Sequence, residues 1–229
     1  MNIQRQAFCS WSGGKDSCLA LNRAIKNDYE ITHLLTMFDE TGLRSRSHSV
    51  SREVMQAQAD ALGLELVMPQ ASWQNYESVF VEELKKLKAQ NFEAAIFGDI
   101  DLQAHRDWEE KVCGAAEIEV VLPLWDENRI ALVNEFFSEG FRSVVICVNE
   151  KFLPKEFCGR VFDERFVEDL PQGVDACGEN GEFHTFVFDG KLFKNPVPYE
   201  IEEIYRHAPV FPSGDAASFY YAKLSLSQN

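Results

Sequence analysis

Six residues near the N-terminus have the side chains and the spacing of an anion-binding site. The stretch AFCSWSGGKDSCLALN, residues 7–22, passes from an apolar run through small residues and one lysine into a helix-like pattern. Glycines let consecutive backbone N–H groups turn toward an oxyanion, and the start of a helix leaves N–H donors without partners. Hydroxyl groups and an ammonium group add donors, so the segment predicts a phosphate site. Its residues are Ser12, Gly13, Gly14, Lys15, Asp16 and Ser17.

An ordinary glycine turn capped by Asp16 is the alternative for this segment. Three features that occur together favour phosphate binding: a strand before the glycines, a lysine directly after them, and flanking serines. The loop matches neither GxxxxGK[ST] nor GxGxxG, so it belongs to neither of those nucleotide-binding classes. We expect Lys15 to be exposed on the loop, and Asp16 to suit the helix dipole or to orient Lys15 or a magnesium ion.

A second candidate segment is Gly98-Asp99, which follows the apolar run AAIF. Parallel sheets bind their ligands at the carboxyl ends of their strands, and this pair lies at such an end. A carboxylate that ends a buried strand is costly without a partner. We therefore predict that Asp99 contacts a ribose, a phosphate or a magnesium ion.

A third candidate segment is DACGENGEFHTFVFDG, residues 175–190. Glu179 and Glu182 bracket the turn pair Asn180-Gly181, so we expect the two carboxylates to project close together, with His184 just beyond. A negative pair attracts an amine or ammonium and can take a proton from it. The alternative is a solvated acidic turn followed by a strand histidine that faces water.

Alternating strand-like and helix-like segments must position these motifs. Strand-like runs are predicted at 6–10, 31–38, 64–68, 94–98, 119–122 and 143–148. Helix-period segments lie between them, at 16–26, 52–62, 76–90, 103–116 and 127–139. Several runs are continuously apolar, as in strands covered on both faces. The repetition predicts an α/β fold with a parallel sheet of five to six strands and helices on both faces.

The pattern changes after residue 148. We predict one domain over 1–148 that carries the phosphate loop, and a smaller C-terminal α+β lobe over 149–229. Within the lobe we predict a helix at 163–170 and short strands at 184–188 and 191–193, separated by the turn signal Asp189-Gly190. The proline-bearing segment 195–214 is assigned no element, and 218–228 is predicted to be an edge strand.

Charge and cysteine content limit the classes of function. There are 37 acidic and 22 basic residues, a net charge of −15, which repels phosphate backbones and anionic membranes. We therefore expect no nucleic-acid partner and no membrane. The six cysteines form no CxxC pair, so no zinc site or disulfide framework is predicted. Without a signal-like segment or an apolar run long enough to span a membrane, we expect a cytoplasmic protein, with homo-oligomerisation left open.

The SGGKDS loop resembles the signature of the PP-loop ATP pyrophosphatases, the adenine nucleotide alpha hydrolase-like superfamily. Within that superfamily the chain resembles the diphthine–ammonia ligase (diphthamide synthase) family. The shared features are this loop, a GD segment followed by PLW at 123–125, the late GENGEF turn, and HSVSREVMQAQADALGLEL at 48–66. The turn GENGEFHTF differs from the GGEYET type that is more frequent in eukaryotic and archaeal members. It resembles the bacterial branch, and bacteria lack the modified histidine of elongation factor two, so the acceptor is left open.

The resemblance implies a two-step reaction. ATP condenses with a substrate carboxylate to give an acyl-adenylate and pyrophosphate, and ammonia or an amine then displaces AMP to form an amide. The implied cofactors are ATP and Mg²⁺, and the implied partners are a small-molecule or protein-bound carboxylate and ammonia or an amine. Residues 1–148 would be the ATP-binding PP-loop domain, and 149–229 the substrate-side lobe.

The implied roles of the site residues fall into two groups. ATP is bound by the six loop residues, by Gly98 and Asp99, and by His48, which reaches the phosphates or the substrate. Superfamily members hold adenine where the second strand ends, here Met37 and Phe38. The catalytic residues are Lys15, Glu179 and Glu182, and the substrate contacts are Asn180, Gly181, Glu182 and His184.

Two other functions stay open from the sequence. PP-loop enzymes that modify tRNA adenylate a base, a function that the strong acidity and the missing CxxC pairs disfavour. Nucleotide-sensing proteins of the same fold use ATP as a switch without cleaving it. The intact loop together with the acidic turn favours catalysis over that role.

Overall fold

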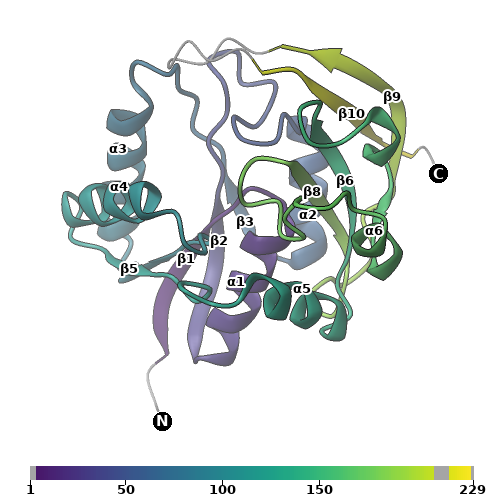
Figure 1. The fold of residues 1–229 in the computed structure, drawn as a ribbon. Helices are drawn as coiled ribbons and strands as arrows, with labels where there is room; N and C mark the ends of the chain where they lie inside the picture. Colours follow the sequence, from purple (N-terminus) through teal and green to yellow (C-terminus); the bar gives the residue numbers. More distant parts are fainter. Residues whose placement is uncertain (1–3, 209–216, 228–229) are drawn as a thin grey trace.

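The computed structural model describes residues 4–208 and 217–227. Five parallel strands form the first sheet, in the order β3-β2-β1-β4-β5 (Figure 1). These strands are β1 (Arg5–Ser10), β2 (Tyr29–Leu35), β3 (Glu65–Val67), β4 (Ala94–Ile96) and β5 (Glu119–Val121). The helices between and after them are α1 (Lys15–Lys26), α2 (Arg52–Leu62), α3 (Tyr76–Ala89), α4 (Gln103–Gly114) and α5 (Arg129–Ser138). The predicted α/β class is confirmed.

The central strand β1 explains why a continuous apolar run predicted a doubly covered sheet. Ala7, Phe8 and Cys9 are all fully buried. Phe8 packs into the core beneath α3 and α4, with Phe80 and Phe97, whereas Ala7 and Cys9 face the core on the side of α1 and α2. Helices therefore cover both faces of the sheet, as Figure 1 shows.

A second sheet lies on the far side of α1 and α2. Its strands pair antiparallel in the order β7-β6-β10-β9, and β8 pairs with β6 as well. Strand β8 contacts α1 and strand β10 contacts α2, so these helices lie between the two sheets. The strands are β6 (Arg142–Asn149), β7 (Val161–Phe162), β8 (Phe183–Asp189), β9 (Tyr199–His207) and β10 (Phe219–Leu226). The lobe also holds α6 (Glu164–Glu168) and a 3₁₀ turn at Lys155–Phe157.

Several expectations for the C-terminal half need correction. The strand predicted at 143–148 exists as β6, but it pairs with the antiparallel strands and not with the parallel sheet. Residues 191–193 form a turn and not a strand. The last strand, β10, is not an edge strand, because it lies between β6 and β9 and pairs with both. Strand β9 itself was missed in the proline-bearing segment 195–214, whose residues from 209 onward lie outside the described ranges.

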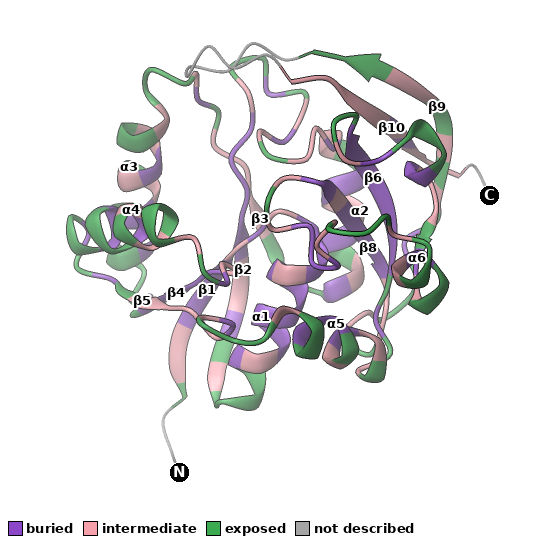
Figure 2. Cartoon of the chain, in the orientation of Figure 1, coloured by how far each residue is buried: buried purple, intermediate pink, exposed green. Residues whose placement is uncertain are grey.

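Burial follows these layers. Strands β6 and β8 and much of α1 are buried, whereas the outer faces of α3, α4 and α5 are exposed (Figure 2). Across the described ranges, no helix has the length and apolarity to cross a membrane. The carboxyl ends of β1 and β4 and the start of α1 meet at one end of the parallel sheet, next to the start of β8.

Candidate functional site

The start of α1 is held by hydroxyl groups from two distant parts of the chain. Gly14 is the N-cap and makes no side-chain cap bond. Its N–H donates to the Ser12 hydroxyl at 3.2 Å, and the Lys15 N–H donates to the Thr185 hydroxyl of β8 at 3.0 Å. Two of the amides that the sequence predicted to be free for a phosphate are therefore engaged by hydroxyl oxygens. The Ser17 hydroxyl closes the loop by donating to the Gly14 carbonyl at 3.0 Å.

Gly13 fixes the loop to the rest of the molecule. Its φ of +84° is a left-handed conformation that favours glycine. Its carbonyl accepts hydrogen bonds from the Val187 N–H at 2.9 Å and from the Gln58 side chain at 3.0 Å. Gln58 is fully buried and also accepts a bond from the Trp11 indole at 2.8 Å. The phosphate loop is thus braced by α2 and by the second sheet.

Gly98 allows β4 to approach the start of α1. A Cβ atom at this position would lie 2.8 Å from the Ser17 nitrogen and 2.9 Å from the Asp16 carbonyl carbon. Both of these atoms are backbone, so they cannot rotate away as a side chain would. Glycine at position 98 therefore brings the GD segment and the SGGKDS loop into direct contact.

Lys15 is the first residue of α1 and is only 5% exposed, so the expectation that it is exposed on the loop is wrong. Its ammonium lies 2.7 and 2.9 Å from the two carboxylate oxygens of Asp16. Burial alone would lower the pKa of Lys15, but Asp16 and Glu179 raise it above its usual value. A charged lysine paired with a carboxylate therefore lies beside the loop. Of the three roles considered for Asp16, the structure displays the contact with Lys15 and the place in the first turn of α1.

Asp99, which lies between β4 and α4, contacts two polar side chains of α4, His105 and Glu109. His105 Nδ1 lies 2.7 Å from Asp99 Oδ1. Burial and a hydrogen bond to Asp99 raise the pKa of Glu109 to about 10, so Glu109 is a neutral acid at neutral pH. Burial acts to raise the pKa of Asp99, but the bonds with His105 and Glu109 bring it below its usual value. Asp99 therefore has the partners that a buried strand end requires.

The acidic turn does not project both carboxylates together, which corrects the expectation for Glu182. Glu182 is 1% exposed, and its carboxylate accepts hydrogen bonds from the Asp175 N–H, the Asn180 N–H and the Asn180 side chain, at 2.9 to 3.2 Å. Its side chain thus closes the turn from inside. Glu179 alone points its carboxylate at the phosphate loop. Burial and the Asp16 carboxylate raise the pKa of Glu179 to about 7, although Lys15 opposes them.

Arg129, which begins α5, ties the acidic turn to the GD segment. Its guanidinium forms two bonds with Asp101, at 2.7 and 2.8 Å, and one with Asp175 at 2.6 Å. Asp175 in turn accepts the N–H groups of Cys177 and Glu179. Arg129 therefore fixes the position of Glu179 relative to the parallel sheet.

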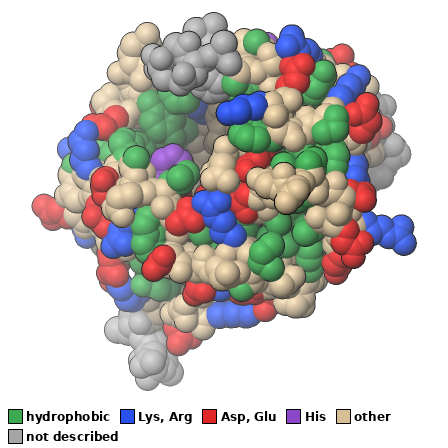
Figure 3. All heavy atoms as spheres, in the orientation of Figure 1, with side chains coloured by type: hydrophobic (Ala, Val, Ile, Leu, Met, Phe, Trp, Pro, Cys, Tyr) green, Lys and Arg blue, Asp and Glu red, His purple; other side chains and the backbone are tan. Residues whose placement is uncertain are grey.

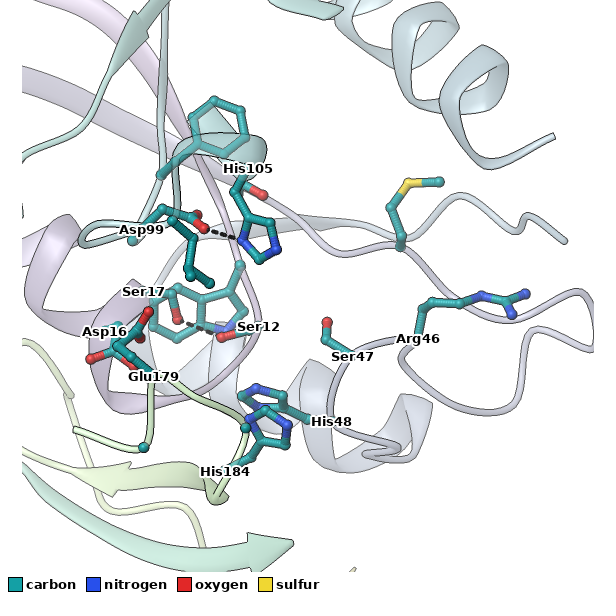
Figure 4. A pocket seen from close by; sticks show the side chains of 18 of the residues that line it. Ser12, Asp16, Ser17, Arg46, Ser47, His48, Asp99, His105, Glu179 and His184 are labelled. Atoms are coloured by element: carbon teal, nitrogen blue, oxygen red, sulfur yellow. Dashed lines mark hydrogen bonds and ion pairs between the residues drawn. The ribbon is translucent and has the colours of Figure 1, made fainter. Parts of the chain in front are cut away.

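Two histidines face each other beside the loop. The rings of His48 and His184 stack with centroids 4.6 Å apart, and Figure 4 shows both at one side of the pocket. Burial and the nearby Lys15 lower the pKa of His184 to about 4. Burial and the neighbouring His184 also lower the pKa of His48. Both rings are neutral at neutral pH, and His184 does not face bulk water from a strand.

These groups line one cavity of about 930 Å³. Figure 3 shows a hollow in this face of the molecule, bordered by hydrophobic side chains and with a histidine visible in it. Of the predicted residues, the cavity is lined by Ser12, Lys15, Asp16, Ser17, Met37, His48, Gly98, Asp99, Glu179, Asn180, Gly181 and His184. Four predicted residues do not line it: Gly13 and Gly14, which shape the loop, Glu182, which closes its own turn, and Phe38. Phe38 is fully buried, with the Arg52 guanidinium over its ring.

The sequence reasoning missed a second group of cavity residues. These are Trp11, Arg46, Ser47, Trp73, Tyr76, Phe80, His105, Glu109, Cys177 and Thr185. Most are single polar or aromatic residues in loops or on helices, with no glycine pattern to mark them. Trp108 of α4 also lines the cavity, whereas Arg106 and Trp125 stack on each other outside the lining. Over residues 4–208 and 217–227, no three His, Cys, Asp or Glu side chains are grouped as a ready-made metal site.

Comparison with known proteins identifies the family. The family model described as Diphthamide synthase N-terminal domain matches residues 5–119, and the one described as Diphthamide synthase C-terminal domain matches residues 128–210. The chain belongs to the diphthamide synthase family. The diphthine–ammonia ligase of Mus musculus is 27% identical over 242 residues, which cover 93% of this chain and 88% of that protein.

Two further relatives differ in how much of their own length the match covers. The diphthine–ammonia ligase of Homo sapiens is 26% identical, over 86% of this chain and 84% of its own. That of Schizosaccharomyces pombe is 25% identical over 86% of this chain, but the match covers only 36% of the yeast protein. Among solved structures, one titled as a predicted subunit of a tRNA methyltransferase from Methanocaldococcus jannaschii matches with a TM-score of 0.43 and 18% identity, over 62% of this chain and 80% of its own.

Proposed function

We propose that this protein is an ATP-dependent ligase that adenylates a substrate carboxylate, releases pyrophosphate, and transfers ammonia or an amine to form an amide. As a member of the diphthamide synthase family it is an ATP-binding enzyme of the ligase class. One observation carries the proposal. The SGGKDS loop, the Gly98-Asp99 strand end and the Glu179 turn, far apart in the sequence, line the same cavity.

In this proposal the phosphates of ATP lie against the start of α1. The hydroxyls of Ser12 and Ser17, 3.1 Å apart, and the ammonium of Lys15 face the cavity there. Negative charge that develops on the α-phosphate during attack is stabilised by donors already fixed in a water-poor pocket, each worth about 3–4 kcal/mol. Met37 lines the cavity where β2 ends and is our candidate for the contact with adenine.

Mg²⁺ fits this site as an ion shared between protein and phosphates. Magnesium is commonly held by one or two carboxylates together with substrate phosphates. Asp16 and Asp99 line the same cavity and are close enough that the charge of Asp99 raises the pKa of Asp16. These two carboxylates would hold the ion, which when bound neutralises phosphate charge. With the ion between them, the attraction of each carboxylate to Mg²⁺ would offset the repulsion between the two carboxylates.

Glu179 is our candidate for handling the ammonia or amine. Its pKa of about 7, raised by burial and by Asp16, is that of a group able to accept a proton near neutral pH. It lines the cavity together with Lys15, so a proton leaving the attacking nitrogen would have an acceptor near the reacting carbonyl. We assign Glu182 a positioning role, because its carboxylate accepts hydrogen bonds from the turn that carries Glu179.

Membership of the family indicates only the reacting group of the acceptor, which is a carboxylate. The relatives compared above are named diphthine–ammonia ligases. The turn GENGEFHTF supports a place in the bacterial branch, so we leave the acceptor open between diphthine and another carboxylate. We also propose a cytoplasmic location, since all six cysteines are unpaired and buried as in reduced proteins.

The decisive experiment is product analysis of ATP with Mg²⁺, ammonium and candidate carboxylates, including diphthine on elongation factor two. AMP and pyrophosphate are the expected products, and their formation over repeated turnovers should disappear in Glu179→Gln, because the variant stops before the amide-forming step. Glu110→Gln, which changes a carboxylate on α4 outside the cavity lining, should leave them unchanged. ADP as the only nucleotide product would refute the proposal. ATP that binds but is never cleaved would favour the sensor function instead.

A further inference from the structure

Two lysine or arginine side chains line the cavity in the described part of the chain, and only one of them belongs to the phosphate loop. That one, Lys15, is paired with both carboxylate oxygens of Asp16. The other is Arg46, in the loop between β2 and α2. Figure 4 shows Arg46 across the pocket from Asp16 and Glu179. The cavity therefore has a second positive group, separate from Lys15 and next to Met37, whose carbonyl accepts the Arg46 backbone N–H at 2.9 Å.

Arg46 is largely covered by its neighbours, and its hydrogen-bond donors are only partly satisfied. Its side chain is 10% exposed, its guanidinium lies over the Trp73 ring at 4.6 Å, and its Nε is buried with no hydrogen-bond partner. One terminal nitrogen donates to Glu40 at 2.5 Å and to the Ala71 carbonyl. Glu40 is 64% exposed, and ion pairs with exposed carboxylates are weak. A buried N–H without an acceptor is unfavourable, so a small rotation toward a ligand oxygen would stabilise this side chain.

The wall next to Arg46 is aromatic. The rings of Trp73 and Tyr76 lie 6.0 Å apart, and Tyr76 also neighbours Trp108, with centroids 5.8 Å apart. Burial raises the pKa of Tyr76 to about 12, and the positive charge of Arg46 opposes this rise. The Tyr76 hydroxyl is thus a neutral donor within the field of Arg46. A guanidinium, a phenol and half-exposed Trp73 together suit an anionic group attached to an apolar segment.

Arg46, Trp73 and Tyr76 form a subsite, and its position distinguishes it from the reacting centre. The carboxylate that attacks ATP has to meet the α-phosphate beside Lys15. Arg46 lies across the pocket from Asp16, the carboxylate that pairs with Lys15 (Figure 4). The cavity also carries the carboxylates of Asp16, Asp99 and Glu179, which repel an anionic acceptor. A cation far from the reacting carboxylate compensates that repulsion only if the acceptor carries a second negative group.

We propose that Arg46 and Tyr76 bind a second anionic group of the acceptor, and that the acceptor is a small dicarboxylate whose carbon chain packs on Trp73. The inference rests on the proposed function and adds to it the class of acceptor and the residues that select it. Arginine suits the task because its planar fork binds a carboxylate through two parallel hydrogen bonds, which lysine cannot reproduce.

Calorimetry with paired acids tests the subsite directly. Glutarate and adipate are compared with pentanoate and hexanoate, which have the same chain lengths and one carboxylate fewer, in the presence of α,β-methylene-ATP and Mg²⁺. The wild-type protein should bind the diacids roughly tenfold to a hundredfold more tightly than the monoacids, the range of one charge-assisted contact. Arg46→Met should remove this preference, and Arg46→Lys should retain a small part of it.

A matched control is available in the second Arg–Trp stack of the molecule. The Arg106 guanidinium lies over the Trp125 ring at 4.9 Å but outside the cavity lining, so Arg106→Met should keep the preference for diacids. Equal binding of mono- and diacids by the wild type, or an unchanged preference in Arg46→Met, would overturn the inference. If Arg46→Met does not fold, the loss in Arg46→Lys decides the question. Binding of α,β-methylene-ATP is measured in the same samples, so a failure of the ATP site is distinguished from a failure of this subsite.

Discussion

Replacing Gly98 with alanine tests whether the contact between β4 and α1 builds the ATP site. The new Cβ would lie 2.8 Å from the Ser17 nitrogen and 2.9 Å from the Asp16 carbonyl carbon, where ordinary contacts begin at 3.4 Å. Both neighbours are backbone atoms, so the strand end and the helix start must move apart. Overpacking of this kind costs about 1–3 kcal/mol in the free energy of unfolding.

The same displacement should weaken ATP binding. The hydroxyls of Ser12 and Ser17 and the ammonium of Lys15 are positioned by the start of α1, which the methyl group pushes away. We expect the Kd for ATP to rise roughly tenfold, the equivalent of about 1.4 kcal/mol. Urea unfolding and calorimetric titration with ATP measure the two effects on one protein preparation.

Gly114→Ala is the matched control for this substitution. Gly114 ends α4, and a Cβ there would meet no atom within 4 Å. Alanine should stabilise the protein by about 0.5–1 kcal/mol, because it restricts the unfolded chain and favours the helix. If Gly98→Ala proves as stable as Gly114→Ala and binds ATP as tightly as wild type, the close contact does not position the site and the reasoning fails.

Three further predictions concern charged and titratable groups of the cavity. Lys15→Met should lower both ATP affinity, by roughly tenfold or more, and thermal stability, because it leaves the Asp16 carboxylate without its partner; an undiminished melting temperature would contradict the pairing. Glu182→Gln should destabilise the protein by about 1–3 kcal/mol in urea unfolding, because its new NH₂ group faces N–H donors of the turn, and a variant that loses turnover at full stability would restore a catalytic role. The pKa of His184 is lowered to about 4 by burial and by Lys15, so the unfolded chain binds the extra proton first as pH falls below about 6.5. Stability should then drop by about 1–3 kcal/mol between pH 7 and 4.5 in urea unfolding, and His184→Asn should lose less; an equal loss in both would exclude this ring as the cause.

Local sequence was sufficient where one physical rule acts on neighbouring residues. The SGGKDS segment predicted a strand, a glycine loop and a helix, because its small residues and its apolar flanks have no other common arrangement. The continuous apolar run around Phe8 predicted a strand covered on both faces, since each of its side chains needs an apolar neighbour. Turn pairs and helix periodicity located the five helices of the first half in the same way.

The site itself depended on distances that only folding sets. Whether Lys15 is exposed was decided by the second sheet, whose Thr185 and Val187 pack onto the loop and bury it. Glu179 and Glu182 are the same type of residue and lie three residues apart. The turn directs one carboxylate into the cavity and closes on the other, a difference that no spacing rule contains.

Strand partners were likewise beyond the reach of local pattern. A run such as β6 has the same apolar composition whether it joins parallel or antiparallel neighbours, and here β8, β7 and β10 all pair with it antiparallel. The residues that line the rest of the cavity, such as Arg46 and Trp73, are isolated in sequence and meet only through chain packing. Sequence by itself therefore determined the strands and helices of the parallel sheet, the glycine loop between β1 and α1, and the family resemblance. The tertiary structure decided which side chains face the cavity and with what charge, because burial and hydrogen-bond partners come from residues far apart in the chain.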